Sequence, residues 1–97
     1  MHYDDRISLE PGKPSRGQNV TVEYRGLLAQ SGADSVWMHC GFDGWSKVQD
    51  IHMRRSAQGC FSCTAMVQGS KEMNFCFKDS ANNWDNNNGY NWSILIK

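Results

Sequence analysis

The sequence predicts an all-β protein, an immunoglobulin-like antiparallel β-sandwich. Short segments in which apolar and polar residues alternate recur about every 10–14 residues, and turn-forming residues separate them. No window keeps the 3.6-residue period of an amphipathic helix. The length of 97 residues suits one domain with one modest core. A small barrel is the alternative arrangement for strands of this kind.

The N-terminal segment differs from the rest of the chain. Residues 1–17 are polar and contain two prolines and two glycines, so we expect an extended lead-in with one possible edge strand near Ile7–Leu9. Residues 18–97 are expected to form a single domain. Its first clear strand begins at Gln18, because apolar residues at 20, 22 and 24 alternate there with polar ones.

The next strand carries two different faces. A turn at 31–34 leads into the strand Ser35–Cys40, where residues 36, 38 and 40 fall on one face. Trp37 and His39 fall on the other face. The segment 41–46, which contains Trp45, is predicted to be a loop. A short strand is then expected over 49–54.

The C-terminal half continues the pattern. Residues 55–59 are expected to turn the chain into a strand over 60–67, and Gly69-Ser70 turns it into a strand over 72–78. The last strand covers 91–96, with apolar residues at 92, 94 and 96. Three large residues of these two strands are assigned to the core: Phe75, Phe77 and Trp92.

Charge and hydropathy limit the partners. Ten basic and ten acidic residues cancel, and no run of like charge is present, which argues against a nucleic-acid or polyanion surface. No apolar stretch reaches the length of a membrane span. The segment 1–6 does not resemble a signal peptide. A cytoplasmic protein and a piece of a longer secreted protein are both compatible with these features.

Four cysteines, at 40, 60, 63 and 76, allow three disulfide pairings that the sequence cannot distinguish. In a strand, residues three apart point to opposite faces, so the sulfurs of Cys60 and Cys63 could not share a metal ion there. We therefore expect free, mostly buried thiols, with a zinc site and disulfides as alternatives.

Candidates for catalysis and for metal binding are weak. The carboxylates of Asp43, Asp79 and Asp85 all lie in turn contexts, and a set built on His39 or His52 lacks a positioning motif. The segment 85–89 partly matches a calcium loop, but its twelfth position is Ile96 instead of a bidentate acid. We expect no enzyme activity and no cofactor. Asp85 is expected to accept hydrogen bonds from backbone amides of its own loop.

The segment Asn82–Trp92 combines three aromatic residues with six asparagines. Asn88-Gly89 is a favourable turn tip, and a sharp turn would hold the preceding Trp84 at the surface. A flat apolar ring surrounded by hydrogen-bonding groups suits a pyranose, which has C–H groups on its faces and hydroxyls around its rim. The alternative is a turn whose Trp84 covers the core, and Tyr90 is not assigned.

Four separated motifs carry a resemblance to a known family. The succession is His-x-Gly-x-x-x-Trp at 39–45, Asn-Phe-x-Phe-x-Asp at 74–79, Trp-Asp-Asn-Asn at 84–87 and Asn-Trp at 91–92. It resembles the family 25 carbohydrate-binding modules and the related family 53 modules of plant starch synthases, over roughly residues 19–96. Family 25 modules are immunoglobulin-like sandwiches that bind starch and malto-oligosaccharides.

The resemblance implies a set of binding residues. His39, Trp45 and Trp84 would form the aromatic platform, and Asn86 and Asn87 would bond to hydroxyls or shape the loop. The function implied is non-catalytic binding of α-1,4-glucans, namely starch, glycogen or malto-oligosaccharides, by aromatic stacking. Trp37 would either extend this surface or pack against the rim of the other sheet.

Two other classes of function stay open from the residues themselves. An immunoglobulin-like domain could use the same exposed aromatic side chains to bind a protein partner. A small domain stabilised by zinc or calcium is the other possibility. The sequence leaves the oligomeric state undetermined, since an edge strand could pair two chains but nothing requires it.

Overall fold

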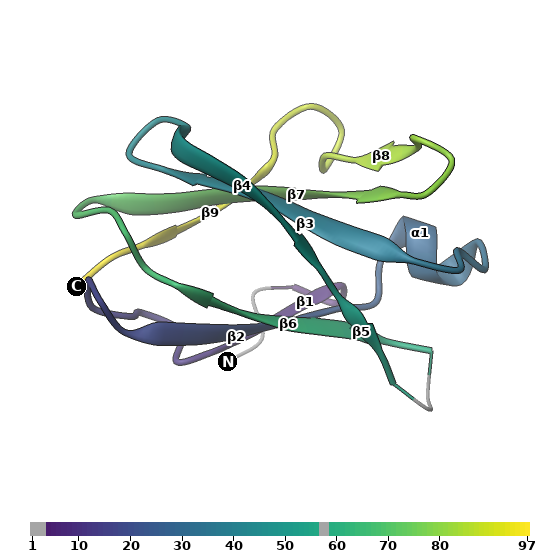
Figure 1. Cartoon of the computed structure of the whole chain (residues 1–97), viewed down its shortest axis with the longest axis horizontal. Helices are drawn as coiled ribbons and strands as arrows, with labels where there is room; N and C mark the ends of the chain where they lie inside the picture. Colours follow the sequence, from purple (N-terminus) through teal and green to yellow (C-terminus); the bar gives the residue numbers. More distant parts are fainter. Residues whose placement is uncertain (1–3, 57–58) are drawn as a thin grey trace.

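The computed structural model describes residues 4–56 and 59–97. Two antiparallel sheets lie face to face in two layers (Figure 1), which confirms the predicted β-sandwich. The first three residues of the predicted lead-in lie outside the described residues. The same holds for 57 and 58, at the centre of the turn expected over 55–59.

The four-stranded sheet has the order β1-β2-β6-β5, and all of its neighbouring strands are antiparallel. Alternate side chains of β2 are buried, as the alternation in the sequence predicts. Ile7 and Leu9 of β1 also lie in the core, so this part of the N-terminal segment belongs to the sandwich. The strands are β1 (Ile7–Glu10), β2 (Asn19–Tyr24), β5 (Arg54–Arg55) and β6 (Phe61–Met66).

The five-stranded sheet has the order β4-β3-β7-β8, and β9 also pairs with β7. Its strands are β3 (Val36–Phe42), β4 (Ser46–His52), β7 (Glu72–Asp79), β8 (Trp84–Asp85) and β9 (Trp92–Leu95). The short helix α1 (Leu27–Gln30) connects the two sheets between β2 and β3 (Figure 1).

Three details differ from the sequence predictions. The predicted loop 41–46 is only three residues long, because β3 continues to Phe42 and β4 begins at Ser46. The predicted strand 49–54 is divided between the two sheets, since buried Met53 separates β4 from β5. Helix α1 was not predicted, because four residues are too few to show a helical period.

The core fills the space between the sheets with side chains from both layers. Phe75, Phe77 and Trp92 are buried there as predicted, and they contact one another through stacked and edge-to-face rings. The Trp92 Nε1 group donates a hydrogen bond to Asp4 Oδ2 (3.1 Å), so the polar atom of this buried indole is satisfied. The described part of the chain contains no helix with the length and apolarity that a bilayer crossing requires.

Candidate functional site

The outer face of the five-stranded sheet is the face that points away from the core. Residues 36, 38 and 40 of β3 are fully buried in the core, whereas Trp37 and His39 are half-buried on the outer face. The sequence predicted this alternation. On β7 the same face carries Cys76 and Lys78, which are the register partners of His39 and Trp37.

Three rings from different segments meet on this face. The ring centroids of His39 and Trp45 are 5.6 Å apart with an interplanar angle of 27°, and those of His39 and Trp84 are 5.4 Å apart with an angle of 89°. The two indoles therefore flank the imidazole at steeply different inclinations. We call His39, Trp45 and Trp84 the aromatic trio. Trp84 has 43% of its surface exposed.

Trp45 is held against β3 by the hairpin between β3 and β4. Its φ angle is +71°, which is uncommon for a bulky residue and lies in the left-handed region, and Gly44 before it also has positive φ. A Cβ atom on Gly41 would lie 2.9 Å from the Trp45 Cα atom, so glycine at 41 permits the close approach. Asn74 Oδ1 accepts hydrogen bonds from the backbone amides of Gly44 and Trp45 (3.2 and 3.3 Å).

The carboxylate of Asp43 fixes the three-residue loop of the same hairpin. It accepts hydrogen bonds from the backbone amides of Ser70, Lys71 and Glu72, at 3.0, 2.7 and 3.1 Å. These bonds lower the pKa of Asp43 to about 2. Asp43 therefore holds the hairpin against residues 70–72.

Trp84 is held in place by its neighbour Asp85, which is 6% exposed and lies on the opposite side of the two-residue strand β8. Asp85 Oδ2 accepts hydrogen bonds from Tyr24 Oη (2.6 Å) and from the Leu27 backbone amide (3.2 Å). The expected bond from its own loop is present but long, at 3.4 Å from the Asn87 amide to Oδ1. A short buried contact with β2 and α1 thus anchors the strand that carries Trp84.

The asparagines of the loop between β8 and β9 serve mainly its backbone. Residues 87, 88 and 91 all have positive φ, which Asn tolerates better than most residues. Asn87 Oδ1 accepts from Arg6 (3.0 Å) and Asn87 Nδ2 donates to the Asn91 carbonyl (3.0 Å). Asn86 Oδ1 accepts from the Gly89 amide (3.0 Å). In the structure the side chains of Asn86 and Asn87 therefore contact the loop and the N-terminal segment, and neither is brought against the aromatic trio by a described contact.

Asp50 and Lys78 form a polar group beside the trio. Asp50 is the register partner of His39, and its Oδ1 lies 2.6 Å from His39 Nδ1. Lys78 Nζ lies 3.5 Å from Asp50 Oδ2 and 5.5 Å from the centroid of the Trp84 ring. Burial raises the pKa of Asp50, but the hydrogen bond and charge of His39 and the charge of Lys78 outweigh it and hold that pKa below its ordinary value.

The other candidate chemical groups lie apart from one another or are used structurally. Asp79 accepts hydrogen bonds from the backbone amides of Ala81 and Asn83. The ring of His52 contacts that of Trp37 in a tilted arrangement, with a centroid distance of 4.9 Å. Within residues 4–56 and 59–97, no group of three or more His, Cys, Asp or Glu side chains is placed to hold a metal ion. All four cysteines are free thiols. Burial raises the pKa of Cys40 and Cys63 to about 12 and that of Cys76 to about 11.

Cys76 lies next to His39 on the neighbouring strand β7. It points to the outer face, yet it is only 5% exposed and is not part of the core between the sheets. Its register partner is His39, the residue whose ring meets both Trp45 and Trp84. A small, buried thiol therefore lies next to the central residue of the trio.

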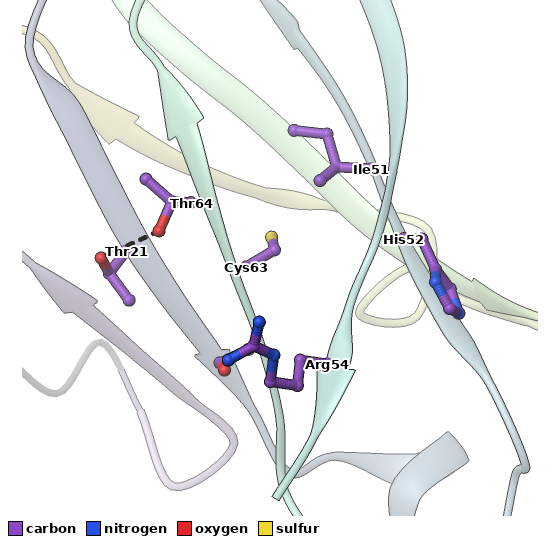
Figure 2. A pocket seen from close by; sticks show the side chains of 7 residues that line it. Thr21, Ile51, His52, Arg54, Cys63 and Thr64 are labelled. Carbon is purple, nitrogen blue, oxygen red and sulfur yellow. Dashed lines mark hydrogen bonds between the residues drawn. The ribbon is translucent and has the colours of Figure 1, made fainter.

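A hollow lies where the chain passes from the five-stranded sheet to the four-stranded one (Figure 2). It is lined by Thr21, Ile51, His52, Arg54, Ser62, Cys63 and Thr64. The hydroxyls of Thr21 and Thr64 bond to each other at 3.3 Å. The lining of the hollow includes no indole or phenyl ring, so it offers less for stacking on a sugar than the trio does.

Sequence reasoning named His39, Trp45 and Trp84, and the structure brings these three together. It missed Asp50 and Lys78, which contact the trio directly. Lys78 alternates with the core residues Phe75 and Phe77, so the strand period placed it on the outer face and a signal for it was present in the sequence. Asp50 had none, because its place beside His39 depends on the register between β3 and β4.

Comparisons with known proteins identify the family of the chain. Residues 20–75 match the family described as starch/carbohydrate-binding module (family 53). The chain is also similar to an alpha-amylase of Clostridium acetobutylicum, with 34% identity over 94 residues. That alignment covers 96% of this chain and 12% of the amylase.

The match supports the predicted resemblance to starch-binding modules. The matched family is family 53, and the match does not confirm the resemblance to family 25. The matched region includes His39 and Trp45 and ends before Trp84. Because the match covers more than half of the sequence, the chain belongs to the starch/carbohydrate-binding modules of family 53.

Proposed function

We propose that this module binds α-1,4-glucans without acting on them, and that it does so by stacking sugar rings on Trp45 and Trp84. One observation carries the proposal: three rings from β3, the β3–β4 hairpin and β8 meet on one sheet face, at centroid distances of 5.6 and 5.4 Å. The alternation along β3 and the Asp85 contact hold these rings in place without any ligand.

The inclination of the rings supports a curved ligand. His39 lies at 27° to Trp45 but at 89° to Trp84, so the two indoles do not form one flat platform. Successive rings of an α-1,4-glucan turn relative to each other and can meet two inclined indoles. A flat β-1,4-glucan presents successive ring faces along one plane and would suit coplanar rings better.

The size of the site indicates moderate affinity. An indole stacked on a sugar removes on the order of 100 Å² of apolar surface from water, worth about 2.5 kcal/mol. Two such contacts and a few hydrogen bonds of about 1 kcal/mol each are opposed by the cost of association. The expected dissociation constant lies between about 1 μM and 1 mM.

A titration of intrinsic tryptophan fluorescence tests the proposal. Maltoheptaose should produce a saturable change in the wild-type protein, and cellohexaose should produce little. The variant Trp84→Ala should lose most of the affinity for maltoheptaose. Met66→Ala is the control, because Met66 is exposed on the four-stranded sheet, away from the trio. A folded wild-type protein that responds to no glucan would refute the proposal and direct the search to protein partners.

A further inference from the structure

We propose that Asp50 and Lys78 bind a pair of adjacent hydroxyls on the sugar ring that stacks on the aromatic trio. This inference rests on the proposed function, because it takes the trio as the place where a sugar lies. It adds a polar recognition element to a surface that is otherwise aromatic, and neither residue was named by sequence reasoning.

The position of the two side chains is the first argument. Lys78 is on β7 and Asp50 is on β4, so their side chains meet above the intervening strand β3. Asp50 contacts His39 at 2.6 Å, and Lys78 Nζ lies 5.5 Å from the centroid of the Trp84 ring. The pair therefore lies beside two of the three rings, where the rim of a stacked sugar would be.

The unused bonding capacity of the pair is the second argument. Charge-assisted hydrogen bonds are normally about 2.7–2.9 Å long, whereas Lys78 Nζ and Asp50 Oδ2 are 3.5 Å apart. An ammonium has three donors, and a carboxylate oxygen accepts more than one bond. Asp50 Oδ1 is engaged by His39, while the contact of Oδ2 among the described residues is the long one with Lys78. The Asp50 side chain is 41% exposed and that of Lys78 is 27% exposed, so both are within reach of a ligand.

The chemistry of a diol matches this arrangement. One hydroxyl of an adjacent pair can donate to Asp50 Oδ2 while its neighbour accepts from Lys78 Nζ. The two hydroxyls would thus bridge the gap between the charges. Such paired contact distinguishes a ring with two free neighbouring hydroxyls from one whose hydroxyls are blocked, a distinction that stacking alone does not make.

The test compares isosteric variants by calorimetric titration. Asp50→Asn removes the charge of the carboxylate, and Lys78→Met removes the ammonium while keeping an unbranched chain against Trp84. Each should weaken maltoheptaose binding about 10-fold, the size expected for hydrogen bonds to a charged group. The controls are Asp34→Asn and Lys13→Met, which change exposed side chains outside the trio and its supporting contacts and should stay within about twofold of wild type. Thermal unfolding of every variant checks the fold.

A second ligand separates direct contact from an indirect effect through His39. Maltoheptaose methylated at its 2- and 3-hydroxyls keeps the ring faces but loses the hydroxyl donors. If the pair binds the diol, methylation should weaken binding to wild type much more than binding to Asp50→Asn or Lys78→Met. Equal weakening in all three proteins would overturn the inference.

Two further outcomes are distinguishable. If wild type binds maltoheptaose and Trp84→Ala does not, but Asp50→Asn and Lys78→Met bind like wild type, the inference is wrong and the proposed function stands. If the folded wild-type protein binds no glucan, the proposed function fails and the inference fails with it.

Discussion

The two faces of the five-stranded sheet use the same kinds of residue for different purposes. On the inner face, Trp92 is 1% exposed, stacks with Phe75 and donates its indole hydrogen bond to Asp4. On the outer face, Trp84 is 43% exposed and is flanked by His39 and Lys78. An aromatic side chain on the inner face stabilises the fold, and one on the outer face remains available to a ligand.

The largest expected effect comes from substituting one tryptophan on each face. Trp92→Ala should lower the free energy of unfolding by about 3–5 kcal/mol, because it leaves a cavity in the core. Trp84→Ala should lower it by less than about 1 kcal/mol, because the side chain is already partly in water. Urea denaturation of both variants measures the two values. Similar losses would show that the outer face carries as much of the fold as the inner face.

The contact between Tyr24 and Asp85 connects the two faces, because it anchors β8 to the core. Tyr24→Phe removes the hydroxyl that donates to Asp85 at 2.6 Å and accepts from the Leu28 amide at 3.0 Å. We expect a loss of about 1–3 kcal/mol in the free energy of unfolding, since buried polar groups lose a partner. Urea denaturation checks this value, and Tyr90→Phe, at an exposed phenol, is the matched control. Unchanged stability would mean that this contact does not anchor the strand.

A substitution at Gly41 should alter the aromatic trio on the outer face and have little effect on the core. A Cβ atom at this position would lie 2.9 Å from the Trp45 Cα atom, so Gly41→Ala should push the hairpin and its indole away from β3. We expect about 10-fold weaker maltoheptaose binding, which corresponds to about 1.4 kcal/mol. Fluorescence titration measures the affinity of the variant for maltoheptaose. Gly44→Ala cannot serve as the control, because Gly44 has positive φ and alanine would strain the hairpin itself. Unaltered affinity would show that the position of Trp45 is unimportant.

The smallest expected effect concerns acid stability. The pKa of Asp43 is lowered from its ordinary 3.8 to about 2, because its carboxylate accepts backbone hydrogen bonds in the folded state. A depressed folded-state pKa means that the stabilisation is complete above about pH 4 and is lost as the pH falls towards 2. Asp43→Asn should remove this part of the acid dependence. Urea denaturation of both proteins between pH 5 and pH 2 (a range set by these values) measures the difference, and identical curves would contradict the assignment.

The sequence predicted those parts of the site that depend on local patterns. The alternation along β3 assigned Trp37 and His39 to the face opposite the core, and the Asn-Gly tip indicated an exposed Trp84. The lining of the core by Phe75, Phe77 and Trp92 followed from the same alternation. These features need only the period of a strand and the conformational preferences of turn residues.

The rest depends on pairings between distant segments. Asp50 lies beside His39 only because of the register between β3 and β4, and no local pattern determines that register. The role of the asparagines was also hard to predict. An Asn side chain can bond to sugar hydroxyls, and Asn also tolerates a left-handed backbone. The positive φ angles at 87, 88 and 91 show how the loop uses them, which composition alone could not distinguish.

The most direct test of the account is an NMR titration of the four tryptophan indole signals with maltoheptaose. Single Trp→Phe variants assign the signals. We expect the Nε1–H signals of Trp45 and Trp84 to shift saturably, while that of Trp92 stays in place because it is buried against Asp4. Shifts confined to residues around the hollow of Figure 2, such as Thr21 and Thr64, with the two indoles unmoved, would contradict it.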